Sequence, residues 1–288
     1  MSGTLYLVST PIGNLEDITL RALRILREEV TTIACEDTRQ TRKLLDHYGI
    51  AKPLLSYHEH NEASRTAEML DLLRRGESIA LASDAGTPLI SDPGYRVVTA
   101  AIREGFAVVP LPGASALMAA LAASGMPTDE FRFVGFLPSK AGARRRALEG
   151  ILQETATVIA YESPHRILDT LDDIAEVLGE QRPVTVAREL TKLHEEFLRG
   201  TARTIHQELS SRPAIKGEIT LLIGKGERVE AKPGDPQGEV QRLQAEGGLS
   251  RMDAIKAVAK QMGLPKREAY RLFAAEGSTP PGRRHDSD

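Results

Sequence analysis

Cysteine is nearly absent from the sequence: Cys35 is the only one in 288 residues. One thiol cannot form a disulfide within the chain, and it cannot supply the paired cysteine ligands of a structural zinc site. The sequence therefore predicts no metal site and favours a reducing compartment. Cys35 directly follows Ile33 and Ala34, so we expect it to be a small residue of a buried core.

Long uninterrupted hydrophobic runs are lacking as well. The N-terminus has neither a basic segment nor a long apolar one, which argues against a signal peptide. Gly105–Thr128 carries no charge and is long enough to cross a bilayer, but Pro110, Pro112 and Gly113 interrupt it. We predict a strand, a Pro-Gly turn and a buried helix of small residues there, and a cytoplasmic protein.

Four signatures of common enzyme classes are missing. The sequence has no G-x-G-x-x-G after its first expected strand and no G-x-x-x-x-G-K-[ST], which disfavours a dinucleotide-binding Rossmann domain and a P-loop nucleotidase. It also lacks H-E-x-x-H and G-x-S-x-G, so a zinc protease and the common hydrolase elbow are disfavoured.

A large charge excess is missing too, since the formal net charge is −3. Any nucleic-acid binding must then depend on a local basic patch, and Leu249–Ala275, where basic residues outnumber acidic ones, provides one. We predict two short helices there, Met252–Met262 and a second from Pro265 to Ala275, which fit a helix-turn-helix module. A helical hairpin used only for packing is the alternative. The candidate RNA contacts in this module are Lys266, Arg267 and Arg271.

Residues 1–113 alternate predicted strands with predicted helices. Apolar runs that end in glycine, proline or charged residues indicate strands, and apolar residues at helical spacing indicate helices. Five such strands are typical of a parallel, doubly wound α/β domain. The expected strands are Thr4–Thr10, Thr31–Cys35, Leu54–Tyr57, Ser78–Ala82 and Ala107–Leu111, and the expected helices are Leu15–Val30, a helix ending at Tyr48, Ala63–Arg75 and Tyr95–Glu104.

Residues 114–226 are predicted to form a second α/β domain. The step from Arg188 to Phe197 is too short for a crossover helix, so it predicts an antiparallel hairpin and a mixed sheet. After this domain we expect a linker at 227–248, the basic module at 249–276 and a disordered tail at 277–288. The expected strands are Phe131–Leu137, Thr157–Tyr161, Val184–Glu189, Glu196–Gly200 and Glu218–Ile223, with helices Arg144–Gln153 and Ile167–Leu178.

The stretch Leu81–Gly94 is the most informative part of the chain. A buried strand ends there in a glycine-containing turn and leads into a helix, the arrangement at which open α/β sheets bind ligands. We expect Asp92 to cap the helix, Pro93 to occupy its first turn, Gly86 to let the backbone approach a ligand and Asp84 to face the crevice. A well-made turn without a ligand is the alternative.

Several turns and motifs, taken together, resemble those of a known protein family. The turns are Ser9–Asn14, Ser83–Pro88 and Pro112–Ala116, and the further motifs are Glu36–Arg39, Ser56–Glu62, Phe136–Lys140, Glu162–Arg166 and Arg188–Lys192. With these the sequence resembles the tetrapyrrole methylase family, and within it the members that methylate the 2′-hydroxyl of a cytidine ribose in 16S ribosomal RNA. The resemblance extends from Met1 to about Gly226, and the basic C-terminal module is similar to the one those members carry.

This resemblance implies a class III methyltransferase with two α/β domains, which binds S-adenosylmethionine in the cleft between them. It also implies a homodimer that acts on 16S rRNA or the small ribosomal subunit. Glycine turns offer backbone N–H groups to the carboxylate of the donor, and Asp84 suits a positive or hydroxyl-bearing part of it. The implied cofactor-binding residues are Pro11, Gly13, Asp84, Gly86, Thr87, Gly113, Ala114, Ser115, Tyr161, Ala187 and Lys216.

A ribose hydroxyl is a poor nucleophile at neutral pH, so a base or a cation beside it would help. The catalytic candidates are Glu36, Asp37, Glu162, Glu189 and Lys192, and His58 is a further candidate. Structural ion pairs with Arg39, Arg166 and Arg188 are the alternative for these carboxylates.

Phosphate contacts outside the C-terminal module are expected from Arg39, Lys140, Arg144 and Arg145. The arginine run that begins at Arg144 could equally be an exposed helix face. Two other functions stay open: methylation of a small tetrapyrrole-like substrate, because fold alone does not define the substrate, and an RNA-binding scaffold with a vestigial donor pocket.

Overall fold

The computed structural model describes residues 2–226, 240, 243 and 250–261. Contacts divide the chain into two units, Met1–Glu227 and Arg228–Asp288, and each is described by itself. The second helix of the predicted C-terminal module, the predicted tail and almost all of the predicted linker lie outside the described residues.

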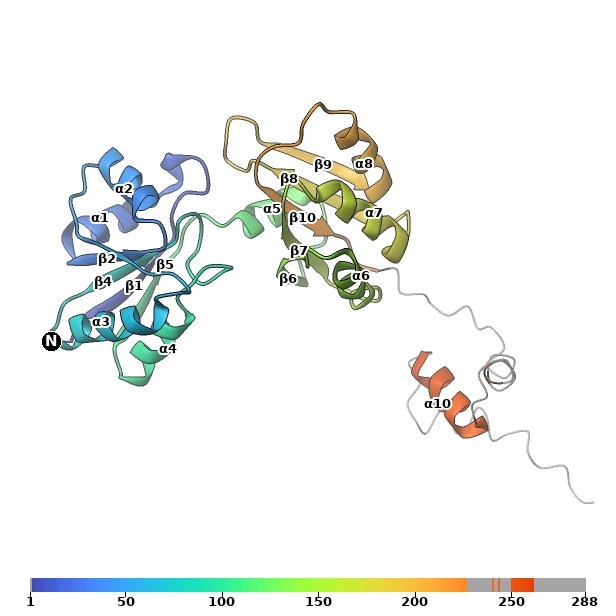
Figure 1. Cartoon of the computed structure of the whole chain (residues 1–288), viewed down its shortest axis with the longest axis horizontal. Helices are drawn as coiled ribbons and strands as arrows, with labels where there is room; N and C mark the ends of the chain where they lie inside the picture. Colours follow the sequence, from blue (N-terminus) through green and yellow to red (C-terminus); the bar gives the residue numbers. More distant parts are fainter. Residues whose placement is uncertain (1, 227–239, 241–242, 244–249, 262–288) are drawn as a thin grey trace, which may run out of the picture. The chain divides into compact units, whose positions relative to one another are not determined.

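The first sheet of Met1–Glu227 is parallel throughout, with strand order β3-β2-β4-β1-β5. This confirms the predicted doubly wound arrangement, in which helices cover both faces (Figure 1). One face packs against α1 and α2 and the other against α3 and α4. The strands are β1 (Thr4–Val8), β2 (Thr32–Cys35), β3 (Leu54–Ser56), β4 (Ile79–Ala82) and β5 (Ala107–Leu111), and the helices are α1 (Leu20–Glu28), α2 (Thr38–His47), α3 (Glu62–Arg74) and α4 (Tyr95–Arg103).

The single helix predicted for Leu15–Val30 is wrong. A short 3-10 helix, η1 (Leu15–Asp17), comes first, and α1 begins only after Thr19. The hydroxyl of Thr19 accepts a hydrogen bond from the backbone N–H of Ala22 at 3.1 Å. That bond satisfies an otherwise unpaired donor of the first turn, so Thr19 starts a new helix inside a continuous apolar pattern.

The second sheet is mixed, with strand order β6-β7-β10-β8-β9. The predicted antiparallel hairpin is confirmed as β8–β9. Helices α6, α7 and α8 pack on one face, and α5 packs on the other. The strands are β6 (Phe131–Phe136), β7 (Thr157–Glu162), β8 (Pro183–Arg188), β9 (Glu196–Thr201) and β10 (Ile219–Ile223), and the helices are α5 (Ala116–Ser124), α6 (Ala141–Glu149), α7 (Ile167–Leu178) and α8 (Ala202–Ser210).

Helix α8 was not predicted, and α6 begins three residues earlier than the predicted Arg144. Thr201 and Thr204 form a reciprocal capping box at the start of α8. This version has threonine in place of the usual glutamate or glutamine partner.

In the second unit the structure describes α10 (Arg251–Gln261), close to the first helix predicted for the C-terminal module. The Ser250 hydroxyl accepts the N–H of Asp253 at 3.2 Å at the start of this helix. Val240, Ala254, Val258 and Ala259 form a small apolar cluster. Among the described helices, none combines the length and the hydropathy needed to traverse a bilayer.

Candidate functional site

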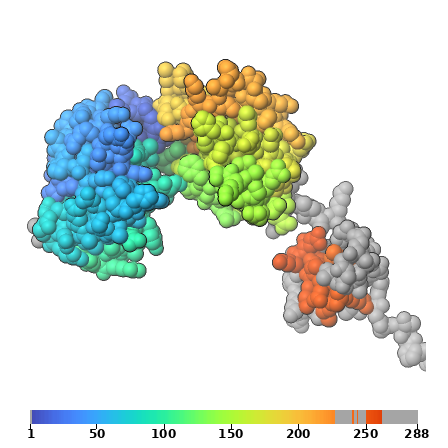
Figure 2. Space-filling model, in the orientation of Figure 1, coloured from blue at the N-terminus to red at the C-terminus, as the bar shows by residue number. Residues whose placement is uncertain are grey.

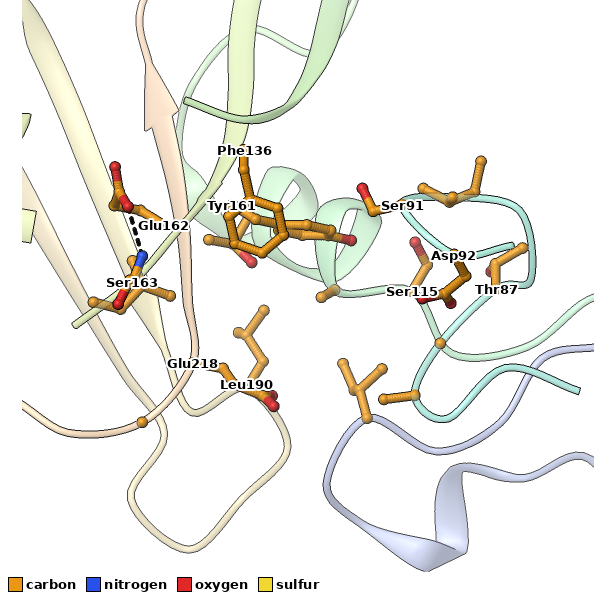
Figure 3. Close-up of a pocket in the computed structure, with 18 of the residues that line it drawn as sticks. Thr87, Ser91, Asp92, Ser115, Phe136, Tyr161, Glu162, Ser163, Leu190 and Glu218 are labelled. Carbon is orange, nitrogen blue, oxygen red and sulfur yellow. Dashed lines mark hydrogen bonds between the residues drawn. The ribbon is translucent and has the colours of Figure 1, made fainter. Parts of the chain in front are cut away.

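A cavity of about 380 Å³ opens among loops from both sheets, and its size is typical of small-molecule sites. Figure 3 shows loop residues of the first sheet facing Phe136, Tyr161, Leu190 and Glu218 of the second. The lining residues are Ile12, Ala85, Gly86, Thr87, Ile90, Ser91, Asp92, Ser115, Ala116, Phe136, Tyr161, Glu162, Ser163, Pro164, Leu190, Gly217, Glu218, Ile219 and Thr220.

Backbone strain concentrates around this cavity. Among the described residues, the non-glycine positions with positive φ are Leu89 (72°), Ser91 (65°), Glu189 (53°) and Thr191 (63°). The first two belong to the β4–α4 loop and the last two to the β8–β9 loop. Such conformations cost about 1–3 kcal/mol each and persist at sites where the surroundings enforce them. The strain therefore supports this cavity as the functional site.

The β4–α4 loop is fixed to the end of β1. The backbone groups of Thr10 and Gly86 exchange two hydrogen bonds, of 2.9 and 3.0 Å. Gly86 has φ +89°, a conformation that side chains disfavour. Thr87 donates its hydroxyl to the carbonyl of Ala114 at 3.3 Å, which joins this loop to the turn after β5. Gly86, Thr87 and Ser115 therefore share one wall of the cavity.

The prediction that Asp92 caps α4 is wrong. The N-cap position is Gly94, at φ +140°, and no side chain caps the helix. Because the loop bends through Leu89, Ser91 and Gly94, the helix starts at Tyr95 and Asp92 lies too early to reach its first turn. Asp92 instead lines the cavity. Burial raises its pKa, and a hydrogen bond with Ser83 offsets part of that rise.

Asp84, predicted to face the crevice, is not among the lining residues. Its carboxylate accepts the backbone N–H of Asp37 at 2.9 Å, so it connects the ends of β4 and β2. Asp37 in turn caps α2 by accepting from the N–H of Arg39 at 2.8 Å. The side chain of Arg39 also bonds Asp37, and these bonds lower the pKa of Asp37 to about 2.

Glu36 lies beside this pair but does not line the cavity. Desolvation, then the nearby charges of Asp84 and Asp92, raise its pKa. Neither Glu36 nor Asp37 is therefore placed against the cavity as a base.

Glu162 contributes to the cavity wall, but its carboxylate is fully buried. It accepts from the backbone N–H of Ser163 at 2.6 Å, from the hydroxyl of Thr170 at 2.7 Å and from Arg166 at 2.6 Å. Figure 3 shows it turned back toward Ser163 and away from the first sheet. The structural alternative, an ion pair with Arg166, thus describes Glu162.

Glu189 and Lys192 form a second internal cluster in the β8–β9 loop. Lys192 donates to Glu189 at 2.8 Å and to Glu218 at 3.0 Å. The bond from Lys192, then that from the N–H of Glu218, lowers the pKa of Glu189. Neither Glu189 nor Lys192 lines the cavity, whereas Leu190 between them does.

The β8–β9 loop meets the turn after β1. The N–H of Asn14 donates to the hydroxyl of Thr191 at 3.1 Å. A Cβ on Gly13 would lie 2.3 Å from the Cγ of Lys192, so only glycine fits without a shift there. Figure 2 shows the surfaces of the two segments, dark blue and yellow, in contact on the face drawn. Gly13 thus lets the turn after β1 approach the β8–β9 loop closely.

The remaining predicted cofactor residues do not line the cavity. Pro11, Gly113, Ala114, Ala187 and Lys216 are not among the lining residues. A Cβ on Gly113 would lie 2.7 Å from that of Ser9, Ala187 belongs to an apolar cluster, and the carbonyl of Lys216 accepts from Arg188. Tyr161, in contrast, lines the cavity.

The side chains predicted to contact phosphate differ in whether they are free to do so. Arg39 and Lys140 are exposed. Arg144 is buried, with its Nε 2.6 Å from an oxygen of Asp173, so it is not free to reach a phosphate. Arg145 is half exposed and bonds both Asp173 and Glu176. Lys266, Arg267 and Arg271 lie outside the described residues.

Residues that the sequence did not single out for the cavity include Ile90, Ser91, Ser163, Pro164, Ile219 and Thr220. Ser163 and Pro164 lie inside the motif Glu162–Arg166, and Ile90 and Ser91 inside the stretch Leu81–Gly94, so the sequence indicated these segments without indicating which of their residues face the cavity. Asp92 gave a misleading signal, because Asp-Pro before a helical pattern usually indicates a cap.

The tetrapyrrole (corrin/porphyrin) methylase model matches residues 4–206. The chain belongs to this family. As a member it is a methyltransferase that uses S-adenosylmethionine, and the predicted α/β methylase fold is confirmed.

Close relatives share a single name. Ribosomal RNA small subunit methyltransferase I of Halalkalibacterium halodurans is 52% identical over 281 residues, which cover 95% of this chain and 96% of that protein. The protein of the same name from Escherichia coli O157:H7 is 45% identical and covers 93% of this chain and 94% of its own length.

Solved structures with lower identity share the fold. A cobalt precorrin-4 methyltransferase of cobalamin biosynthesis has a TM-score of 0.57 at 18% identity, covering 77% of this chain and 94% of that one. Uroporphyrin-III C-methyltransferase from Thermus thermophilus, complexed with S-adenosyl homocysteine, has a TM-score of 0.53 at 18% identity, covering 78% and 98%. At this identity the likeness concerns the fold alone.

Proposed function

We propose that this methyltransferase modifies the RNA of the small ribosomal subunit, at the 2′-hydroxyl of a cytidine ribose in 16S rRNA. The observation that carries the proposal is the agreement of relatives that are 45–52% identical over 90% or more of both chains and are all named ribosomal RNA small subunit methyltransferase I. A small tetrapyrrole substrate has weaker support, because it depends on structures of 18% identity.

The residues of the cavity fit the donor. S-adenosylmethionine combines an apolar heteroaromatic ring with hydroxyl, ammonium, sulfonium and carboxylate groups. The cavity supplies apolar side chains from Ile12, Leu190 and Ile219, and hydroxyls from Thr87 and Ser115. Bound there, the donor supplies an electrophilic methyl group. Gly86, Thr87, Ser115 and Tyr161 would contact it, and the other predicted cofactor residues would support the wall.

Asp92 replaces the earlier candidates as the proposed proton acceptor. Glu162, the pair of Glu189 and Lys192, and Asp37 are all committed to internal bonds. Asp92 lines the cavity and has no ion pair among the described residues. A raised pKa makes its carboxylate a better base for the proton that the ribose hydroxyl loses during attack. Good positioning of that hydroxyl supplies the rest of the rate enhancement.

RNA contacts are proposed for the exposed Arg39 and Lys140, and for Lys266, Arg267 and Arg271 of the C-terminal region. Arg145 remains a weaker candidate, because it already pairs with two acidic residues. A homodimer and a cytoplasmic location also remain proposals.

Primer extension at low nucleotide concentration tests the reaction. On 16S rRNA from a strain that lacks the gene we expect a ribose-methylation stop to disappear, and the wild-type gene should restore it. A stop that persists in the deletion strain would refute the assigned reaction.

Calorimetric titration with S-adenosyl homocysteine tests the pocket. Gly86→Val should weaken binding, because valine disfavours φ +89° and its side chain would meet Ile12. Gly105→Val is the control, since Gly105 also has positive φ (77°) but has nothing within 4 Å of its Cβ position. If the two variants bind S-adenosyl homocysteine with equal affinity, Gly86 does not belong to the donor site.

A further inference from the structure

Strand β6 carries an irregularity just before it reaches the cavity. Phe133 is paired with Ile159 and Phe136 with Tyr161, so three steps along β6 match two along β7. Gly135, between them, has φ +67°. An extra residue with a left-handed glycine is the signature of a β-bulge, which re-aims the side chains that follow it.

The bulge changes the face on which Phe136 lies. In a regular strand Phe136 would share a face with Val134, which packs on the core beneath α6 and α7. Instead it lies with Phe133 on the cavity side, where both rings contact Tyr161. The ring centroids are 5.0 Å apart for Phe133 and 5.7 Å for Phe136, both edge to face. Leu137 then returns to the core.

Phe136 remains 60% exposed although it lines the cavity. Moving a phenylalanine out of a core position forfeits about 1.5–3 kcal/mol of burial, and Tyr161 recovers only part of that contact. The bulge therefore keeps an aromatic ring exposed at the cavity at a cost in stability. A ligand with a flat apolar face that packs on the ring explains this cost.

We propose that Phe136 is a stacking platform for the nucleobase of the acceptor nucleotide. This inference rests on the proposed function. A base must leave its stack before its sugar can enter a cavity of this size, and unstacked bases are held on aromatic side chains. Stacking on an aromatic ring replaces the lost base–base contact without the need for a hydrogen bond.

The position of the ring favours the acceptor over the adenine of the donor. Figure 3 shows Tyr161 between Phe136 and the group of Ser91, Asp92 and Ser115. The chain continues from Phe136 to the exposed Lys140, a proposed phosphate contact. An RNA strand that passes Lys140 therefore reaches Phe136 before it reaches the wall formed by the first sheet.

The test compares Phe136→Ala, Phe136→Leu and Phe136→Tyr in the full-length enzyme. Methyl transfer is followed on small ribosomal subunits from a strain that lacks the gene, and S-adenosyl homocysteine affinity is measured by calorimetry. We expect alanine and leucine to raise KM for the subunit about 5- to 140-fold, the range that stacking implies. Tyrosine should stay near wild type, and donor affinity should not change.

Leucine keeps apolar bulk but has no ring face, so it separates stacking from simple filling of space. A leucine variant equal to wild type, or a loss of donor affinity that matches the loss of activity, would overturn the inference. If the wild-type enzyme does not methylate the subunits, the proposed function fails instead. Gly135→Ala gives an independent check, since it strains the bulge and should raise KM while Phe136 is retained.

Discussion

Arg144, Arg145 and Arg146 are adjacent in the sequence but have different environments. Arg144 is buried against Asp173, Arg145 is half exposed, and Arg146 is exposed. A helix turns by about 100° per residue, so consecutive side chains point in different directions. The basic run could be read from the sequence, but which of its members faces the core could not, because that depends on where Asp173 of α7 lies.

Arg144→Ala should lower the free energy of unfolding by about 3 kcal/mol, because it removes one partner of a buried ion pair. Arg145 still bonds Asp173, which keeps the loss at the lower end of the usual range. Urea denaturation measures the effect, and Arg146→Ala is the matched control with little expected change. Similar stabilities for the two variants would show that the buried pair contributes nothing.

Asp92→Asn should lower activity and yet stabilise the protein at neutral pH. The pKa of Asp92 is raised in the folded state. The wild type therefore loses stability as pH rises from about 4, near the value in the unfolded chain, through the folded-state pKa, whereas asparagine does not titrate. The Tm difference should grow over that interval and vanish below it. If Asp92 is the proton acceptor, kcat falls about 10²- to 10⁴-fold.

The exposed Asp129 lies outside the lining residues, and Asp129→Asn serves as the control. A Tm difference for Asp92→Asn that is the same at all pH values would contradict the assigned burial effect. If Asp92→Asn folds normally and its kcat is unchanged, Asp92 is not the proton acceptor.

At the scale of elements, the order and type of the strands could be predicted because their apolar runs are short and end in clear turn residues. What could not be predicted depends on backbone conformation. The break before α1 depends on one hydroxyl of Thr19. The true start of α4 depends on positive φ at Leu89 and Ser91, which side chains disfavour and sequence patterns do not indicate. The bulge at Gly135 is hidden in an ordinary strand pattern for the same reason.

A substitution of Gly217 tests whether the loop before β10 must approach the β8–β9 loop closely. It has φ +93°, and a Cβ there would lie 2.4 Å from the Cγ of Glu189. Gly217→Ala should therefore displace Glu189 from Lys192, with a loss of stability of about 1–3 kcal/mol and weaker binding of S-adenosyl homocysteine.

Gly105→Ala is the matched control, because Gly105 has φ +77° with nothing within 4 Å of its Cβ position. Gly105→Ala introduces backbone strain like that of Gly217→Ala, but its new Cβ has no close neighbour such as Glu189. Equal losses in the two variants would mean that strain alone matters and that the approach to Glu189 does not.

At the scale of the whole molecule, the unit Met1–Glu227 holds both sheets with their own apolar clusters. The family and the α/β class could be predicted because motifs spread along the chain agreed with one another. The boundary predicted between residues 113 and 114 remains a prediction. Partners and oligomeric state could not be derived from patterning, since they depend on surfaces that several distant segments build together.

A truncation after Glu227 should leave the Tm of the main transition and the affinity for S-adenosyl homocysteine unchanged, because the two sheets and the cavity lie before that residue. It should weaken binding to small-subunit RNA and flatten the dependence of log K on log salt, since the basic residues proposed to neutralise phosphates are removed. Salt titrations of full-length and truncated protein measure this. Identical slopes would show that the C-terminal region makes no phosphate contacts.

The position of β10 has a consequence for synthesis. It lies at the centre of the second sheet, between β7 and β8, yet it is the last strand of that sheet in sequence. While the chain emerges from a ribosome, the earlier strands have no common neighbour to join them until Ile219–Ile223 appears. The cavity, which Ile219 and Thr220 help to line, is therefore completed only after β10 has been synthesised, and a nascent chain stalled before that point carries a finished first sheet but an incomplete second one.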